Sequence, residues 1–162
     1  MNAKQMIFLR NVVPAAIAAQ RAYGIPASIT IAQAIFESSW GESALASKAN
    51  NYFGIKATAN ATPDEYAEFM TTEFVDGRKV QEMAKFAKYA SPADSFAAHS
   101  RLLSVAPRYA SAMAVKNDPA AFAAAIQKDG YSTDPIYGTK LMQAVTDYDL
   151  TQYDTAPNTS TS

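Results

Sequence analysis

The chain has 162 residues, of which 49% are hydrophobic and 18% charged, and its formal charge at pH 7 is -1. This length and composition fit one globular domain with a substantial core, and they exclude a disordered chain. The balanced charge argues against a nucleic-acid partner, because binding to a phosphate backbone normally needs a basic excess. The sequence has no Cys and a single His, His99, which excludes disulfides, thiol nucleophiles and His-rich metal sites. An enzyme of this composition would use carboxylates as its acids and bases, and we expect neither a metal nor a cofactor.

Apolar residues recur at helical spacing between Met6 and Ile17 and predict a helix over residues 3–23 that ends at Gly24. The same segment has some features of a secretory signal peptide. However, Arg10 and Asn11 interrupt the apolar region that a signal peptide needs. We therefore expect a structural helix and no signal peptide. No stretch approaches the roughly 20 apolar residues of a membrane span.

Start and stop signals predict four more helices, two of them opened by the pairs Ser91-Pro92 and Asp118-Pro119. They cover about residues 26–39, 92–103, 119–129 and 135–148. Between the first two of these, residues 65–89 are rich in Tyr, Phe, Val and Thr, and Asp76-Gly77 is a strong signal for a two-residue hairpin turn. Pairing outward from that turn sets Glu73 opposite Val80.

These elements predict an α+β fold that is mostly helical, with a small β-hairpin lobe inserted after the second helix. Residues 1–150 are expected to form one domain. Residues 151–162 are expected to be a disordered tail or the start of a linker, because their final part consists of Thr, Ser, Asn and Pro.

The second helix carries the most informative pattern. Thr30, Gln33 and Glu37 form a polar line, because residues three and four apart share one helix face, while the rest of the helix is apolar. A helix that is apolar nearly all round is buried, so its single carboxylate should lie at a cleft and have a raised pKa. Such a group suits general acid catalysis. From the residues alone, a cap or ion pair at the helix end is an equal alternative.

Residues 32–41, AQAIFESSWG, resemble the glucosaminidase domain of glycoside hydrolase family 73. This family includes the hydrolase half of the flagellar rod-associated peptidoglycan hydrolase, many autolysins and phage lysins. Three further segments match the family in the same order: 51–56 (NYFGIK), 71–74 (TTEF) and 129–137 (DGYSTDPIY). A single match would be weak, but four in order span almost the whole chain.

The resemblance implies a lysozyme-like fold with a sugar-binding groove between the helical body and the β-lobe. It implies that Glu37 is the catalytic acid and that Glu73, on the β-lobe, is the second carboxylate, which would activate water on the opposite face of the sugar. Alternatively, the N-acetyl group of the substrate is the nucleophile, oriented by Tyr131 or Glu73. The sequence leaves both mechanisms open.

Tyr131 matches the family tyrosine near the catalytic acid and is the third catalytic candidate. The candidate substrate-binding residues are Gln33, Trp40, Asn51, Phe53, Gly54 and Tyr137. Several of these have structural readings as well, since Trp40 could cover the core and Phe53 and Tyr137 could be part of it. His99 is interpreted as structural.

The expected function is therefore an endo-β-N-acetylglucosaminidase that cleaves the glycan β-1,4 bond of peptidoglycan. A muramidase or lytic transglycosylase is the alternative within the same class, and a non-catalytic peptidoglycan-binding module is the alternative outside it. The expected partner is the peptidoglycan glycan strand, and the protein is expected to be a monomer that acts in the bacterial cell wall or periplasm. Without a recognised signal peptide, a phage lysin, a delivered effector or an excised domain of an exported protein is expected.

Overall fold

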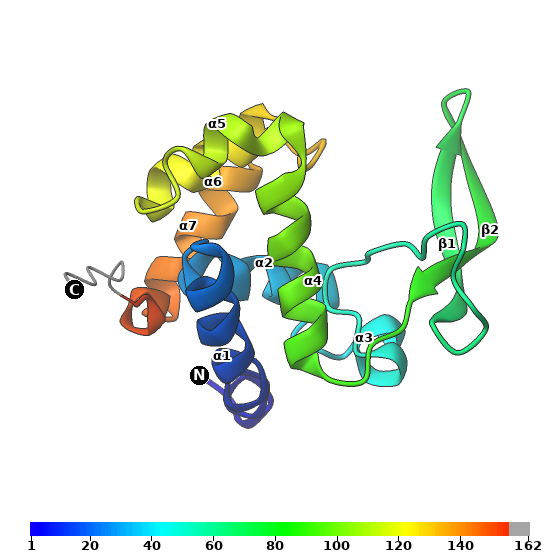
Figure 1. Cartoon of the computed structure of the whole chain (residues 1–162), viewed down its shortest axis with the longest axis horizontal. Helices are drawn as coiled ribbons and strands as arrows, with labels where there is room; N and C mark the ends of the chain where they lie inside the picture. The colour runs from blue at the N-terminus through cyan, green and yellow to red at the C-terminus, as the bar shows by residue number, and fades with distance from the viewer. Residues whose placement is uncertain (156–162) are drawn as a thin grey trace.

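The computed structural model describes residues 1–155 and shows a helical body with a β-hairpin beside it (Figure 1). The α-helices are α1 (Ala3–Tyr23), α2 (Ala27–Ser38), α3 (Ala44–Ala49), α4 (Pro92–Val105), α5 (Ala110–Met113), α6 (Pro119–Lys128) and α7 (Tyr137–Asp147). Two short 3-10 helices, η1 (Pro107–Tyr109) and η2 (Leu150–Tyr153), and the strands β1 (Tyr66–Val75) and β2 (Arg78–Ala87) complete the described elements. The predicted mostly helical α+β fold is confirmed. No helix among the described residues combines the length and apolarity that crossing a bilayer requires.

Local signals set the helix ends. α1 ends at Gly24, whose φ of 85° is a left-handed conformation that glycine adopts without strain. The side chains of Ser91 and Asp118 accept hydrogen bonds from the backbone three residues on, and so cap α4 and α6. Both helices begin with the predicted proline. The short helices α3 and α5 and the 3-10 turns were not predicted, although Ser43 caps α3 by accepting a hydrogen bond from Ala46 N at 3.1 Å.

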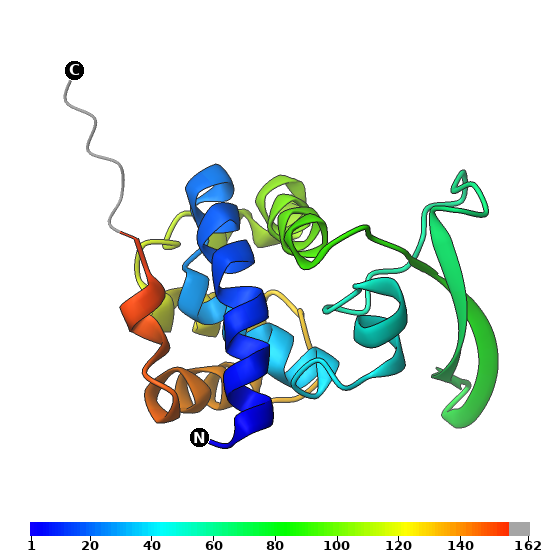
Figure 2. The same cartoon turned by 90° about the horizontal axis from the view of Figure 1, so that it is seen from below.

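Helix α2 lies in the centre of the body, and α1, α6, α7 and η2 pack against it (Figure 2). All of its residues from Ala27 to Ile35 are buried, including the polar Ser28, Thr30 and Gln33. This agrees with the prediction from its apolar circumference. The C-terminal end of α2 points toward the side of the body on which α3 and the hairpin lie (Figures 1 and 2).

The hairpin pairs as the turn signal predicts, with Glu73 opposite Val80. Asp76 (φ 52°) and Gly77 (φ 76°) form the turn, and both take the positive φ values of a type I′ hairpin. At its base the hairpin is tied to the body by the preceding loop, through the bonds Ala87 N–Ile55 O and Ala57 N–Lys85 O of 3.0 and 2.9 Å. Its distal part stands away from the body (Figures 1 and 2).

The C-terminal segment corrects the predicted start of the tail. Leu150 is buried, residues 150–153 form η2, and Asp154 hydrogen-bonds α2. One Asp154 carboxylate oxygen accepts a hydrogen bond from Ser28 N (2.7 Å), and the other accepts one from Ser28 Oγ (2.8 Å). α2 begins after Pro26, which offers no side-chain cap, so Asp154 supplies the cap from the far end of the chain. Residues 156–162, the rest of the predicted tail, lie outside the described residues.

Replacing Asp154 with Ala should lower the free energy of unfolding by about 1–3 kcal/mol, because it leaves a buried backbone N–H and a buried hydroxyl of Ser28 without acceptors. Urea denaturation followed by circular dichroism measures this change. Glu68→Ala, which removes an exposed carboxylate of the hairpin, is the control and should change stability by less than about 0.5 kcal/mol. Equal unfolding midpoints for the two variants would show that Asp154 does not hold α2.

Candidate active site

Glu37 lies in the last turn of α2, where the buried helix emerges at the surface. Its carboxyl group is open to solvent, yet the surrounding protein displaces enough water to raise its pKa above the ordinary range. The neighbouring Tyr137 hydroxyl, acting as a donor, has the opposite effect and lowers the pKa, but burial is the larger effect. Glu37 is thus placed to hold a proton and to meet a ligand from solvent.

Tyr137, the first residue of α7, contributes the hydroxyl beside Glu37. It reaches this position because the next residue, Gly138, lets α7 approach α6 closely. A Cβ on Gly138 would lie only 2.9 Å from the backbone oxygen of Ala123. Tyr137 is 5% exposed, and burial raises the pKa of its phenol, which therefore stays protonated. The structure brings Tyr137 and Glu37 together, so Tyr137 is both part of the core and part of the site.

Gln33 was a candidate for substrate binding, but the structure buries it completely behind Tyr137. Its Nε2 donates to the Tyr137 hydroxyl oxygen at 3.3 Å, and its Oε1 lies 2.9 Å from His99 Nε2. Both ends of the amide are therefore used inside the protein. Gln33 therefore contacts Tyr137 and His99 inside the protein and is not exposed to a ligand.

His99, on α4, is 1% exposed, and burial lowers its pKa to about 3, so the ring is neutral. Phe53 stacks on it with the ring centroids 3.9 Å apart and the planes 3° from parallel. The sequence interpretation of His99 as a structural residue missed its contact with Gln33. One signal was available, because an amide in the middle of an apolar helix must find buried hydrogen-bond partners.

Tyr131 lies in the loop before α7 and is half-buried. Its ring stacks on Tyr137, with centroids 5.5 Å apart and planes at 18°. Burial raises the pKa of its phenol well above the ordinary value, and the neighbouring Tyr137 and Glu37 add to the effect. The two tyrosines therefore lie together beside the carboxyl group, as predicted for Tyr131.

The loop after α3 places three further candidates. Asn51 is 1% exposed, and its side chain is fully engaged: the amide donates to Ile55 O (2.8 Å) and Ala87 O (2.9 Å), and its oxygen accepts from Ile55 N (3.1 Å). Asn51 thus shapes the wall and ties the hairpin to it, without a free polar atom for a ligand. Phe53 is buried in the core, in line with its structural reading. Gly54 is exposed and has a φ of 69°, so it serves the loop conformation.

Trp40 follows α2, where its ring packs edge-on against Phe8 and Tyr148 with centroid distances of 5.4 and 4.8 Å. It covers the junction of α1 and α7 and lines a small hollow of about 230 Å³ that it shares with Phe36. These contacts support the interpretation that Trp40 covers the core. Its partial exposure is the one observation in favour of a contact with a sugar.

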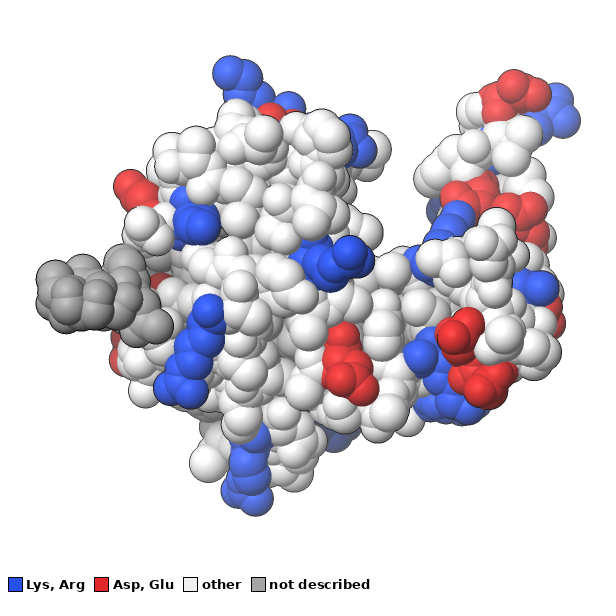
Figure 3. Space-filling view, viewed as in Figure 1, with Lys and Arg blue, Asp and Glu red and all other residues white. Residues whose placement is uncertain are grey.

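Glu73 lies on β1, on the half-covered face of the hairpin, and forms an ion pair with Lys56 at 2.7 Å. The hairpin and the body enclose a wide notch, which is visible in the space-filling view (Figure 3). Among the described residues, the side-chain hydrogen bond of Glu73 is to Lys56 and not to Glu37. The two carboxyl groups come from the two separate parts of the molecule.

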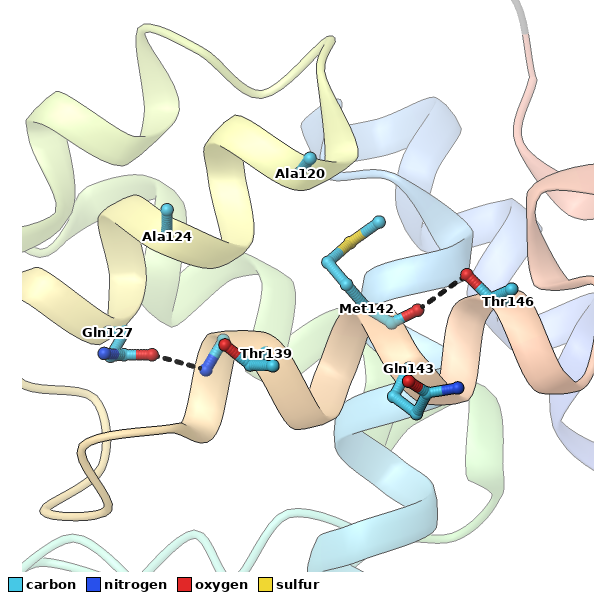
Figure 4. A pocket seen from close by; sticks show the side chains of 8 residues that line it. Ala120, Ala124, Gln127, Thr139, Met142, Gln143 and Thr146 are labelled. Atoms are coloured by element: carbon cyan, nitrogen blue, oxygen red, sulfur yellow. Dashed lines mark hydrogen bonds between the residues drawn. The ribbon is translucent and has the colours of Figure 1, made fainter.

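A second concavity of about 530 Å³ lies between α6 and α7 (Figure 4). Small and amide side chains line it, together with Met142, and its wall includes no charged residue and not Glu37. Gln127 closes one end, where its Oε1 accepts from Gly138 N at 2.7 Å. This groove contains no acidic or basic side chain. The surface around Glu37 is therefore the better candidate for the active site.

Comparison with known proteins agrees with this geometry. The family model described as mannosyl-glycoprotein endo-beta-N-acetylglucosaminidase, named Glucosaminidase, matches residues 13–150. The chain is 35% identical over 139 residues to the peptidoglycan hydrolase FlgJ of Vibrio parahaemolyticus, covering 84% of this chain and 45% of that protein. It is 36% identical over 156 residues to the exo-glucosaminidase LytG of Bacillus subtilis, covering 93% and 54%. The chain therefore spans about half the length of these curated relatives.

Solved structures show the same fold. The catalytic domain of the autolysin Auto from Listeria monocytogenes superposes with a TM-score of 0.83 at 30% identity, covering 95% of this chain and 89% of that one. The glycoside hydrolase domain of FlgJ from Salmonella typhimurium superposes with a TM-score of 0.74 at 30% identity, covering 94% and 91%. The family model matches most of this chain. The chain therefore belongs to the glucosaminidase family, glycoside hydrolase family 73, as its four motifs suggested.

Proposed function

We propose that this protein hydrolyses the β-1,4 bond of peptidoglycan glycan strands on the reducing side of N-acetylglucosamine, with Glu37 as the general acid. The observation that carries the proposal is a solvent-accessible carboxyl group whose pKa is raised by burial, at the end of an otherwise buried helix. The names of the relatives support the substrate class, since they include peptidoglycan hydrolases, an autolysin and an exo-glucosaminidase. The proposed place of action is the cell wall or periplasm.

In the proposed reaction, the glycan strand lies in the notch between the body and the hairpin (Figure 3). The Glu37 carboxyl transfers its proton to the glycosidic oxygen as the bond from that oxygen to the sugar C1 breaks, and the electron pair stays on the oxygen. A water molecule forms the new bond to C1 and loses a proton. Burial raises the pKa of Glu37 and so favours the protonated form that a general acid needs.

We assign the acceptance of the water proton to Glu73. It lies on β1 of the hairpin, whereas Glu37 lies at the end of α2 in the body, and a wide separation of the two carboxyl groups would leave room for water and predict inversion at C1. The ion pair with Lys56 holds the Glu73 side chain in place. Tyr131 is assigned to the sugar next to the bond, where a phenol can pack on the ring and hydrogen-bond the acetamido group. The buried Tyr137 hydroxyl accepts from Gln33 and faces Glu37.

The direct test is mass spectrometry of the soluble products released from purified peptidoglycan. Wild-type protein should release fragments with reducing-end N-acetylglucosamine, and Glu37→Gln should lower the rate at least about 100-fold, because the amide has no proton to transfer. Reducing-end N-acetylmuramic acid would indicate a muramidase, and anhydro-muramic ends a lytic transglycosylase. Wall binding without release of fragments would indicate a binding module instead.

Replacing Tyr137 with Phe should move the alkaline limb of the kcat/KM profile to higher pH. The hydroxyl stabilises the ionised form of Glu37 and lowers its pKa, so its removal raises the pKa and lets the acid keep its proton further into the alkaline range. The rates are measured with a soluble glycan oligomer across pH. Tyr153→Phe is the control and should leave the alkaline limb at the same pH. A shift of the limb to lower pH in Tyr137→Phe would contradict the assignment of Tyr137 as a donor to Glu37.

Replacing Glu73 with Gln should lower kcat by about 100-fold or more and should leave the stability unchanged to within about 1 kcal/mol, because the ion pair with Lys56 is exposed. Proton NMR of fresh products should show the α-anomer at the new reducing end, as inversion requires. A β-anomer, together with substantial activity of Glu73→Gln, would favour attack by the substrate's own acetamido group.

A further inference from the structure

Three buried side chains from three different helices form a continuous hydrogen-bonded path behind Glu37. The path runs from His99 on α4 to Gln33 on α2 (2.9 Å) and from Gln33 to the Tyr137 hydroxyl on α7 (3.3 Å). The Tyr137 hydroxyl lies next to the Glu37 carboxyl group, where its effect as a donor lowers the pKa of the acid. Gln33 and His99 are at most 1% exposed, so water does not compete for these bonds.

The direction of each bond follows from the donors and acceptors available. Gln33 presents Nε2, a donor, to the Tyr137 oxygen, so that oxygen accepts and the phenolic proton is left to donate to Glu37. The other end of the amide, Oε1, is an acceptor and faces His99 Nε2. This path requires the single proton of the neutral His99 ring to be on Nε2, the nitrogen that faces Gln33.

An amide can turn over and exchange its oxygen for its nitrogen, and this would reverse the path. The Gln33 oxygen would then face Tyr137 and accept the phenolic proton, which would turn that proton away from Glu37. A donor at His99 holds the amide in the first orientation, because the reversed amide would set an N–H group against the Nε2–H group of the ring. Packing supports the ring itself, which lies parallel to Phe53 at 3.9 Å and edge-on to Tyr131 at 5.9 Å.

We infer that Gln33 and His99 are positioning residues of the reaction, which hold the Tyr137 hydroxyl as a donor toward Glu37. The inference rests on the proposed role of Glu37 as the acid. With the Tyr137 proton directed at one oxygen of the carboxyl group, the acidic proton of Glu37 resides on the other oxygen, which is free to meet the glycosidic oxygen. His99 does this without touching the substrate and without changing its own charge.

The groups that bear on the titration of Glu37 are few. Burial raises its pKa, and the Tyr137 hydroxyl on α7 lowers it. Tyr131, from the preceding loop, lies close enough for the charge of Glu37 to raise the pKa of its phenol. From α4, the facing group is the neutral ring of His99, which acts through Gln33. Loss of the directed Tyr137 donor should therefore raise the pKa of Glu37.

The decisive variants are His99→Phe, which keeps an aromatic ring against Phe53 but removes the donor, and Gln33→Met, which keeps the length of the side chain but breaks the path. Each should lower kcat about tenfold with KM changed less than about twofold, because the acid is misaligned while the binding surface is intact. Each should also move the alkaline limb of the kcat/KM profile to higher pH, as Tyr137→Phe does. Ser100→Ala, a change at the neighbouring buried residue whose hydroxyl has no hydrogen-bond partner, should alter neither kcat nor the limb.

A double mutant separates positioning from a merely structural role. In the Tyr137→Phe background there is no hydroxyl to direct. Adding His99→Phe should therefore change kcat by less than about twofold and should leave the alkaline limb of the kcat/KM profile at the same pH. If His99→Phe lowers kcat equally with and without the Tyr137 hydroxyl, the inference is wrong. The inference is also wrong if His99→Phe and Gln33→Met have the same kcat and the same pH profile of kcat/KM as the wild type while Glu37→Gln is inactive. That result would still support the proposed function.

Nuclear magnetic resonance provides a test that does not need activity. Nitrogen-15 shifts should show the proton of His99 on Nε2, and carbon-13 titration of the Glu37 carboxyl should show a higher pKa in His99→Phe than in the wild type. A proton on Nδ1, or an unchanged pKa of Glu37, would overturn the inference even if no substrate of the protein were cleaved. An inactive wild-type protein would instead contradict the proposed function.

Discussion

The burial of nearly all of α2 is the constraint on which the rest of the molecule depends. Ten of its twelve residues are buried, and α1, α6, α7 and η2 surround it. A helix enclosed in this way has a fixed position and rotation, because its neighbours pack against every side of it. The residue that emerges at its end, Glu37, is therefore held by the whole body and not by a local loop. The general acid proposed at this position needs such support, since small displacements of a reacting group reduce the rate strongly.

The burial of α2 also has an energetic consequence, because it places polar side chains in the interior. Each of them has a partner: Thr30 bonds Pro26 O, Ser28 bonds Asp154, and Gln33 bonds Tyr137 and His99. An unpartnered amide at this depth would cost about 1–3 kcal/mol. The fold satisfies Gln33 with groups from α4 and α7, and this arrangement connects three helices at the point where the carboxyl group emerges.

The hairpin is attached in a different way. Its base is bonded to the loop over residues 55–57, while large apolar side chains near its tip, such as Phe74, are exposed. Glu73 reaches back only to Lys56, which lies in the same loop. The body thus provides a rigid position for one carboxyl group, whereas the second is carried by an element with few contacts to that body. Elements with few buried contacts are the ones that move most easily.

Local chemistry explains what was predictable from the sequence. The pair Asp76-Gly77 specified the hairpin register, because both residues tolerate the positive φ values of the turn. Likewise, Ser91 and Asp118 marked the starts of α4 and α6. The apolar circumference of α2 indicated its burial, and with it the perturbed pKa of Glu37.

The parts that were missed depend on contacts between distant residues. Gln33 and His99 are 66 positions apart, and Ser28 and Asp154 are 126 apart. No local pattern in the sequence pairs such residues. For the same reason, Gln33 and Asn51 were predicted to face the substrate: a polar residue beside a functional motif has the same pattern whether it binds a ligand or a buried backbone group. Only their hydrogen-bond partners distinguish the two roles.

The cap that Asp154 provides for α2 has a consequence for the order of events during synthesis. The ribosome makes α2 within the first forty residues, but its N-terminal turn gains its acceptor only when residue 154 has emerged. Until then, α2 lacks this cap, although α6 and α7, which also pack against it, have already been synthesised. Residues 150–154 therefore complete the contacts around α2, and the helix that carries Glu37 receives its cap only when nearly all of the described chain has been translated.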